Sequence, residues 1–514
     1  MTKYIKLFSS IATLLIAIVG LHIEAEGQTP DARYKLIRQQ YKIYADGSSD
    51  YNYRKEIQLI RNRAITAYAD KGETFIVYNP DFQSLTINEC YTIRKDGSKV
   101  ITPKRAFVEQ LPSQCTDCGR FNNFVELVIV HTALEYDCTI VLDYTLHSNT
   151  DILQDKIQLT QDCPVDKYEI IVDKPYNMHL FSYLANGGQN VKVKNDKHAL
   201  HIVGTNLTQS SAEHYLPPAE EIYPTLYLSN RESTKDDMKK IKENLPDAQM
   251  LLNTIKNQVN NIGYLTKSER NLQLVTRIRD YVVDNIHTNN LTPAMVGYST
   301  ASPAEVWKSN CGTPYEKAIL LSALFKQAGF YAYTTYGEKE YKTTDGKRFF
   351  LHSPSETQVS VLVDGKQLWL SPVEKTPLMP NNNETTHYTE IDWNPSNENG
   401  YQTKQLPPLS PQNIDPSYLT AKRTMPLKST ICDDHYTYVL HVPTSATLLN
   451  PTELSYTIDG LGAISISVKQ SGNVVTVEKH MKVDKDLIEV SQYEDFRKMM
   501  IDWQQFNTLY FKFK

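Results

Sequence analysis

The stretch GTPYEKAILLSALFKQAG, residues 312–329, decides how the middle of this chain folds. It opens with a helix start, in which Thr313 can cap the helix and Pro314 occupies the first position, where a missing N–H costs nothing. Glu316 stands three residues after the cap and can bond back to it. Apolar residues follow at helical spacing until Gly329, a common left-handed stop. The stretch therefore predicts a helix from Pro314 to Gly329.

Helices are predicted before this stretch and strands after it. Apolar residues three and four apart predict a helix over 271–286, and Ser302 to Glu305 opens a second, short one. After Gly329, alternating apolar residues over 331–336, 359–363 and 368–370 predict strands. Because the strands follow the helices as a block, residues 229–375 are predicted to form an α+β domain.

The rest of the chain is predicted to be mostly β. Residues 26–228 contain many short β-rich runs with turn signals such as Asp96-Gly97, which predict an antiparallel β-sandwich. Residues 376–427 are rich in Pro, Asn, Ser and Thr and predict a linker. Residues 428–514 return to strands, with one helix near 493–503, and predict a C-terminal β-rich domain. The fold class is thus α+β multidomain.

The beginning of the chain is typical of a secretory signal peptide. Lys3 and Lys6 precede an apolar run over 7–21, and a polar stretch follows from Glu24. We assign residues 1–25 to this signal. The mature chain is then expected to be exported to the periplasm, cell envelope or exterior, with no membrane span after signal removal.

Composition and cysteines limit the function classes. The net charge of −5 over 514 residues gives no reason to expect nucleic acid as a partner. Cys115 and Cys118 form a CxxC in a polar loop, for which a local disulfide or free thiols are expected. No complete zinc-ligand pattern is found, and His198 and His201 lie in strand-like sequence. We therefore predict no metal and no cofactor.

Several motifs together resemble exported bacterial proteins that contain a transglutaminase-like, papain-related domain. In these proteins that domain lies between a β-rich domain of unknown function and a small C-terminal β domain. The resemblance is carried by these stretches: Leu85–Cys90, Ile93–Gly97, Ala304–Trp307, 312–329 and Tyr493–Arg497. It implies a cysteine-dependent active site at the start of the 314–329 helix.

The catalytic positions implied by this resemblance are all substituted. The family pattern Gly-Asp-Cys-x-x-Lys-Ala falls on residues 312–318, which places Pro314 at the cysteine. The histidine position, just before the 359–363 strand, holds Gln358, and the aspartate of Trp-x-Asp-Pro is Ser371. Proline is no nucleophile, glutamine is no general base near neutral pH, and serine carries no charge to stabilise an imidazolium.

A displaced catalytic pair is the alternative. Cys311 lies three residues before Pro314 and His352 six residues before Gln358, with Asp364 as a candidate to orient the imidazole. A catalytic pair needs heavy atoms within about 3 Å, which a shift of three residues out of the helix opposes. A buried or disulfide-bonded Cys311 and a solvated loop His352 are the plainer expectation.

The sequence therefore favours a non-catalytic, exported protein. A cleft bounded by Pro314, Tyr315, Gln358 and Trp369 is expected to bind a peptide, a glycan or an envelope protein. The alternatives are a cysteine amidase, protease or transglutaminase that uses Cys311 and His352, and a structural protein of envelope assembly.

Overall fold

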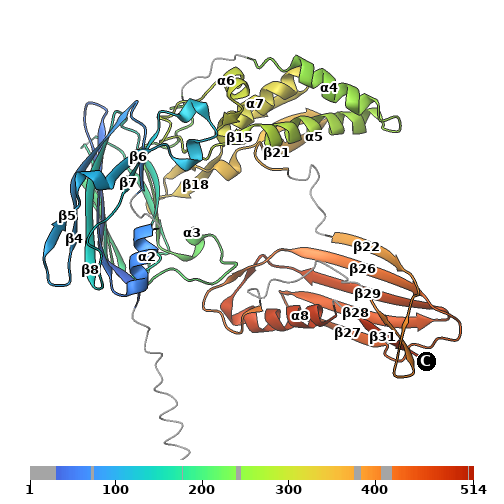
Figure 1. The fold of residues 1–514 in the computed structure, drawn as a ribbon. Coiled ribbons are helices and arrows are strands. Elements are labelled where there is room, and N and C mark those ends of the chain that lie inside the picture. Colours follow the sequence, from blue (N-terminus) through green and yellow to red (C-terminus); the bar gives the residue numbers. More distant parts are fainter. Residues whose placement is uncertain are drawn as a thin grey trace, which may run out of the picture.

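The computed structural model describes residues 30–70, 75–175, 177–238, 245–375, 384–406, 419–506 and 509–514. The predicted signal peptide, residues 1–25, lies outside the described residues. Within the described ranges, no helix is both long enough and apolar enough to cross a membrane. The chain forms a β-rich N-terminal part, a central helix–sheet part and a C-terminal sheet with one long helix (Figure 1).

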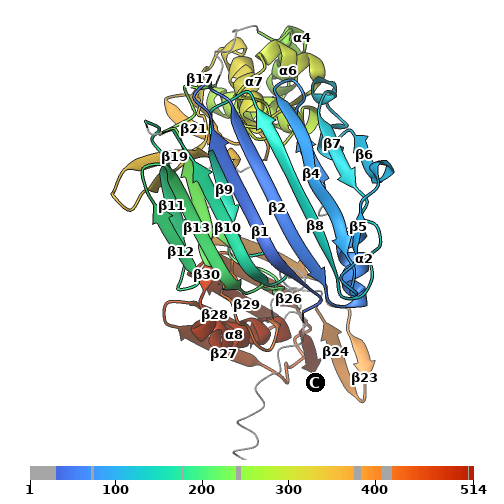
Figure 2. The same cartoon turned by 90° about the vertical axis from the view of Figure 1, so that its left-hand side faces the viewer.

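The N-terminal part is built on one large sheet. Its strands, in spatial order, are β12 (Val191–Asn195), β13 (Ala199–Leu207), β10 (Val165–Asp173), β1 (Ala32–Ile43), β2 (Ser49–Leu59), β8 (Cys138–Ser148), β4 (Gln83–Ile93) and β5 (Lys99–Ile101) (Figure 2). The β1–β10 pair is parallel. The prediction of a purely antiparallel sandwich is therefore wrong at this pair. Parallel strands are joined by long connections, so no local turn signal in the sequence indicates that β1 and β10 are neighbours.

Two small sheets cover one face of the large sheet. The first contains β9 (Gln154–Gln158), β11 (Phe181–Ala185) and β14 (Thr225–Ser229), and the second β3 (Phe75–Tyr78), β6 (Phe107–Gln110) and β7 (Val125–Ile129). Ile140 packs in the core under the first, and Leu142, on the same face of β8, packs under the second. Two short helices, α2 (Asn62–Asp70) and α3 (Ala219–Ile222), were not predicted.

The central part places helices before a sheet, as predicted. The helices are α4 (Gln249–Asn260), α5 (Lys267–Asn285), α6 (Pro303–Ser309) and α7 (Pro314–Gln327). The sheet has the order β17 (Tyr331–Thr334), β20 (Val359–Val363), β21 (Lys366–Leu370), beside the hairpin β18 (Glu338–Lys342) and β19 (Arg348–His352). Two short strands, β15 (His287–Thr288) and β16 (Cys311–Gly312), pair in parallel. Helix α7 is buried in the core between the other helices and the sheet.

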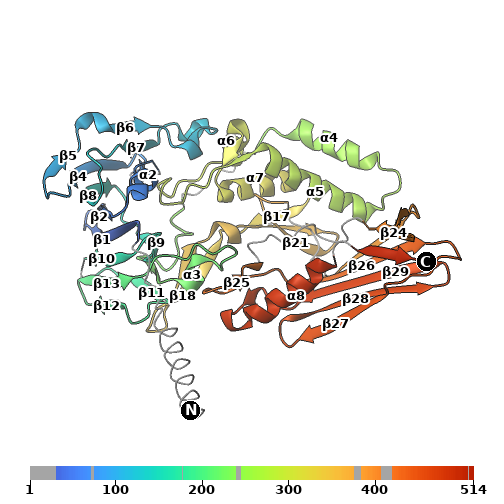
Figure 3. The same ribbon diagram turned by 60° about the horizontal axis from the view of Figure 1, so that its bottom comes forward.

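The C-terminal part is a five-stranded sheet with one long helix. Its order is β22 (Glu384–Ile391), β26 (Cys432–His441), β29 (Val474–Val483), β28 (Gly462–Ser471) and β27 (Thr452–Ile458). Helix α8 (Tyr493–Gln505) packs on one face through Phe496 and Trp503 (Figure 3). Smaller pairings join β23 (Ser396–Glu398), β24 (Tyr401–Gln405) and β31 (Tyr510–Phe513), and β25 (Leu427–Lys428) with β30 (Leu487–Ile488).

The predicted linker over 376–427 is wrong in part. Of the residues described there, 384–391 form β22, which joins the C-terminal sheet in parallel beside β26. Strands β23 and β24 follow in the same stretch. The Pro-rich and Asn-rich composition hides these strands because Thr386 to Glu390 are exposed and show no apolar alternation.

Candidate functional site at the start of helix α7

The start of α7 is the helix start that the sequence predicts. The Thr313 hydroxyl accepts a hydrogen bond from the Glu316 amide at 3.3 Å, and Glu316 Oε2 accepts one from the Thr313 amide at 2.9 Å. Pro314 is the first helical residue and is buried. The helix therefore begins with a cap that satisfies the Glu316 N–H and with a proline at the position that the resemblance assigns to a nucleophile.

One end of the helix–sheet unit holds the three positions that the resemblance assigns to catalytic residues, which are Pro314, Gln358 and Ser371. The Thr334 hydroxyl, at the end of β17, donates to the Ala318 carbonyl in the first turns of α7 at 3.2 Å. Thr334 pairs with Val359, and Val359 pairs with Leu370. Gln358 and Ser371 are the residues next to this row. The topology thus brings Gln358 and Ser371 to the end where Pro314 starts its helix.

Gln358 and Ser371 have structural bonding partners at this end. The backbone N–H of Gln358 donates to the Thr335 hydroxyl at 3.1 Å, and the backbone carbonyl of Gln358 accepts from the Thr335 backbone N–H at 2.9 Å. The Ser371 hydroxyl accepts from the amides of Val373 and Glu374 at 3.2 and 3.1 Å and so closes a turn. Both residues stabilise the ends of strands.

A loop of the N-terminal part covers the α7 start. The Arg120 guanidinium donates to Glu316 at 2.7 and 3.3 Å, and to the Cys311 carbonyl at 3.3 Å. Glu316 is 3% exposed and also accepts from the Ala301 amide at 2.8 Å. Its carboxylate therefore accepts four hydrogen bonds from three groups, which belong to three segments of the chain.

A disulfide between Cys118 and Cys311 joins the same two parts of the chain, with Cα atoms 5.7 Å apart. The expectation of a local Cys115–Cys118 bond is therefore wrong: Cys115 is a free, buried thiol in the same cluster. The bond also removes Cys311 as a displaced nucleophile in this structure, because the attacking species must be a thiolate. A disulfide-bonded Cys311 is the plainer of the two expectations given above.

The other two members of the displaced site lie apart. His352 is the last residue of β19, where it stacks on Tyr336 at 4.8 Å, so the expectation of a solvated loop is wrong. Burial lowers the pKa of His352 to about 4. Asp364 lies in the turn after β20, and its carboxylate accepts from Asn271 at 3.0 Å. Because the five residues of β20 extend over roughly 16 Å, Asp364 lies far from the end of the sheet that holds Gln358.

The residues of the predicted binding cleft divide into two places. Tyr315 is half-buried and lies edge-on to Tyr336 at 4.9 Å. Trp369 is 46% exposed and lies on the face of β21 opposite the buried Leu370, edge-on to Tyr333 at 5.9 Å. The expected single cleft around Tyr315 and Trp369 is therefore not the arrangement observed.

A polar hollow does lie at the α7 start, between the N-terminal and central parts. It has a volume of about 270 Å³. Charged and amide side chains line much of it: Asn79, Asp81, Arg120 and Asn123 from the N-terminal part, and Glu305 and Glu316 from the central part. Sequence reasoning missed Arg120 and Cys118 as partners of this helix, because neither residue shows a local pattern that points to it.

Lys317 anchors the other side of the α7 start. Its side chain is fully buried, and its Nζ donates to the Ile286 carbonyl at 2.6 Å and to the Thr288 hydroxyl at 2.8 Å. Ile286 caps the C-terminal end of α5, which favours a cation. Burial nevertheless lowers the pKa of Lys317 from 10.5 to about 8.

We expect Lys317 to make stability depend on alkaline pH. Between pH 8 and 10.5 the unfolded chain binds the proton that folded Lys317 releases, so the free energy of unfolding rises with pH. The rise should reach about 3 kcal/mol at most, and Lys317→Met should lack it. Urea unfolding across this pH range measures the difference. Lys326→Met, in the exposed last turn of α7, is the control and should keep the wild-type slope.

Two protein-family models match this chain, one in its N-terminal part and one in its C-terminal part. Residues 45–208 match a family described as a domain of unknown function with a solved structure, DUF3857. Residues 401–509 match a second family so described, DUF3858. These matches confirm the expected domain of unknown function before the central part and a separate domain after it. No curated protein matches the chain significantly.

One solved structure resembles nearly the whole chain. It is described as "a putative protease from Parabacteroides distasonis ATCC 8503", and it has 24% sequence identity and a TM-score of 0.74. The match covers 94% of this chain and 99% of that chain. This likeness shows a shared fold. An M1 zinc metallopeptidase from Deinococcus radiodurans has 7% identity and a TM-score of 0.18 over 57% of this chain and 62% of that one, too low for any argument.

Proposed function

We propose that this chain is a non-catalytic, exported protein built on a transglutaminase-like scaffold. The observation that carries the proposal is the closed start of α7. Pro314 stands where the resemblance places the nucleophile, and Cys311 is bonded to Cys118. The partly exposed Arg120 and the buried Glu316 form an ion pair across the same junction. A reactive cysteine site needs an accessible thiolate, whereas this helix start is capped and covered.

We further propose that the binding surface is the face of the central sheet turned away from α7, and that it binds a glycan of the cell envelope. Tyr333 and Trp369 flank Ser360, which is 2% exposed, on neighbouring strands. The Gln367 amide donates to the Tyr333 hydroxyl at 2.7 Å and to the Ser360 hydroxyl at 2.8 Å. Tyr331, 71% exposed, extends the aromatic surface.

The chemistry of this aromatic face fits a sugar chain. Exposed tyrosine and tryptophan rings offer flat apolar faces with a polar edge, which suit the C–H face of a pyranose ring. The amide and hydroxyl groups beside them can bond sugar hydroxyls. Three large aromatic side chains exposed together on one sheet face are more than a soluble surface needs, and such patches mark interaction sites.

Cysteine labelling tests the absence of catalysis. Native protein is treated with iodoacetamide at about pH 6 and mapped by mass spectrometry, because only a thiolate of low pKa reacts quickly there. We expect no label on Cys311 and a linked Cys118–Cys311 peptide. Rapid labelling of Cys311, or hydrolysis of amide substrates that Cys311→Ser abolishes, would instead support the displaced cysteine enzyme.

Retention on envelope polysaccharides tests the binding surface. We expect the wild-type chain to bind immobilised peptidoglycan or capsular polysaccharide, and Trp369→Ala to lose at least tenfold in affinity. Trp393→Ala is the control, because Trp393 packs against the C-terminal core beside Phe513. Equal binding by wild type and Trp369→Ala, or binding to peptides alone, contradicts the glycan surface and leaves the labelling result unaffected.

A further inference from the structure

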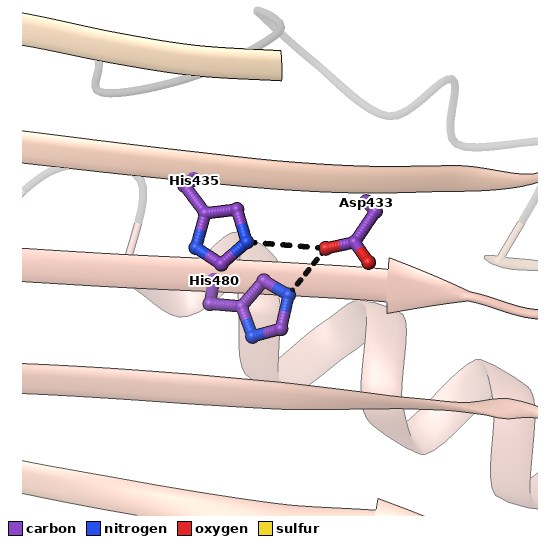
Figure 4. A group of neighbouring side chains, drawn as sticks. All are labelled: Asp433, His435 and His480. Atoms are coloured by element: carbon purple, nitrogen blue, oxygen red, sulfur yellow. Dashed lines mark hydrogen bonds and ion pairs between the residues drawn. The ribbon is translucent and has the colours of Figure 1, made fainter. Parts of the chain in front are cut away.

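Three side chains that can ligate a metal lie together on the outer face of the C-terminal sheet (Figure 4). Asp433 and His435 are two residues apart on β26, so both side chains leave the strand on the same face. His480 lies directly opposite His435 on β29. The register of β26 and β29 thus brings His435 and His480 together, although they are about 45 positions apart in the sequence.

The opposite face of the same strands is occupied by the core. Tyr436 of β26 is buried and packs near Trp503 of α8, and Lys479 of β29 lies over the same indole at 4.0 Å. The cluster therefore sits on a rigid, fully paired sheet whose inner face is packed. Its own side chains are partly open to solvent: His435 is 41% exposed, His480 29% and Asp433 30%.

The ligand atoms converge on one point. His480 Nε2 lies 2.7 Å and His435 Nε2 3.2 Å from the same oxygen, Asp433 Oδ1. The two imidazole rings are stacked 3.9 Å apart and within 8° of parallel, so both Nε2 atoms face the same side. All three ligand atoms lie within 4.8 Å of one another.

We propose that Asp433, His435 and His480 form a binding site for a divalent first-row transition metal, with Zn²⁺ as its natural fit. Zinc binds imidazole nitrogen and carboxylate oxygen at about 2.0–2.2 Å, so tetrahedral ligands stand about 3.3 Å apart. The distance from His435 to Asp433 already matches. The shorter one, from His480, requires the partly exposed Asp433 carboxylate to move by roughly 0.6 Å. Because an imidazole binds a metal in the plane of its ring, one of the two stacked rings must also rotate out of the stack, which a rotamer change of a partly exposed histidine supplies.

The ligand set also selects among metals. Two imidazoles and one carboxylate suit Zn²⁺, Cu²⁺ or Ni²⁺ and disfavour Ca²⁺ and Mg²⁺, which take oxygen ligands. Two neutral imidazoles and one carboxylate leave a bound dication with one net positive charge and an open position toward solvent. Lys482, opposite Asp433 on β29, is a nearby cation, and its ammonium is paired with Asp484 at 3.0 Å.

The site is independent of the proposed function at α7, and it differs from the expectation of no metal drawn from the sequence. Without a metal, the same three residues form a surface hydrogen-bonded cluster in which both imidazoles compete for one carboxylate oxygen. A metal replaces that competition with one cation shared by three ligands. The two states differ in a measurable way, because only the second binds metal in a defined stoichiometry.

Metal titration of the full chain, stripped with a chelator, tests the proposal. We expect one Zn²⁺ per chain in competition with a colorimetric chelator, released at acidic pH because imidazole ligates only when neutral. His435→Gln and His480→Gln should each weaken binding at least tenfold. Asp433→Asn, which keeps the side-chain shape, should also weaken it and guards against misfolding in the histidine variants.

Two controls complete the experiment. His441→Gln replaces the exposed histidine at the end of the same strand and should bind Zn²⁺ like wild type. Cys432 precedes Asp433 in the sequence and is the thiol that could bind the metal instead. The Co²⁺-loaded chain should therefore show the d–d bands of a nitrogen and oxygen site and no thiolate charge-transfer band. Wild-type binding no tighter than that of His435→Gln, or a thiolate band, would overturn the site.

Discussion

Replacing Cys118 with alanine should cost roughly 3–5 kcal/mol of unfolding free energy, because the lost bond closes a very long loop. Cys118 and Cys311 are 193 residues apart. The cross-link therefore removes much of the freedom of the unfolded chain, and it also ties the N-terminal part to the central one. Urea unfolding of oxidised protein, followed by tryptophan fluorescence and circular dichroism, measures the loss.

Cys115→Ala is the matched control for this variant. Cys115 and Cys118 lie in the same loop and are both fully buried, yet only Cys118 is cross-linked. Each substitution removes one buried sulfur, so the difference between the two variants isolates the disulfide. Reductant should destabilise wild type and Cys115→Ala alike and leave Cys118→Ala unchanged. Equal stability of the two variants before reduction would mean that the bond contributes nothing.

The local parts of the fold could be predicted from sequence, because their causes are local. The α7 start follows from Thr313, Pro314 and Glu316, whose capping pattern needs no distant partner. Four strands of the C-terminal sheet are predicted from their β-rich sequence, and the alternating burial of β28 and β29 agrees with this. Strand β22 was missed because it lies at the edge of its sheet and its residues 386–390 are exposed.

The candidate sites depend on contacts that no local pattern encodes. The Arg120–Glu316 ion pair and the Cys118–Cys311 bond each join residues more than 190 positions apart. His435 and His480 meet only through the register of two strands. Asp433 and His435 are two residues apart in the sequence, but they become part of a three-ligand site only once the strand and its partner are known.

Removing the buried Glu316 carboxylate should destabilise the chain by about 2–4 kcal/mol, because a partly buried ion pair and two backbone hydrogen bonds are lost together. In Glu316→Ala, Arg120 loses its carboxylate partner, and the backbone amides of Ala301 and Thr313 lose their acceptor. Urea unfolding of full-length protein measures the loss. Glu316→Gln, which keeps an acceptor oxygen without the charge, should fall between Glu316→Ala and wild type.

Glu269→Ala separates the capping role of Glu316 from its role between the two parts of the chain. Glu269 forms the same kind of capping box with Thr266 at the start of α5, but it lies on an exposed surface. Its loss should cost only about 1 kcal/mol. If Glu316→Ala costs no more than that, capping alone accounts for Glu316. The ion pair with Arg120 would then not hold the α7 start closed, and the non-catalytic proposal would rest on Pro314 and the disulfide alone.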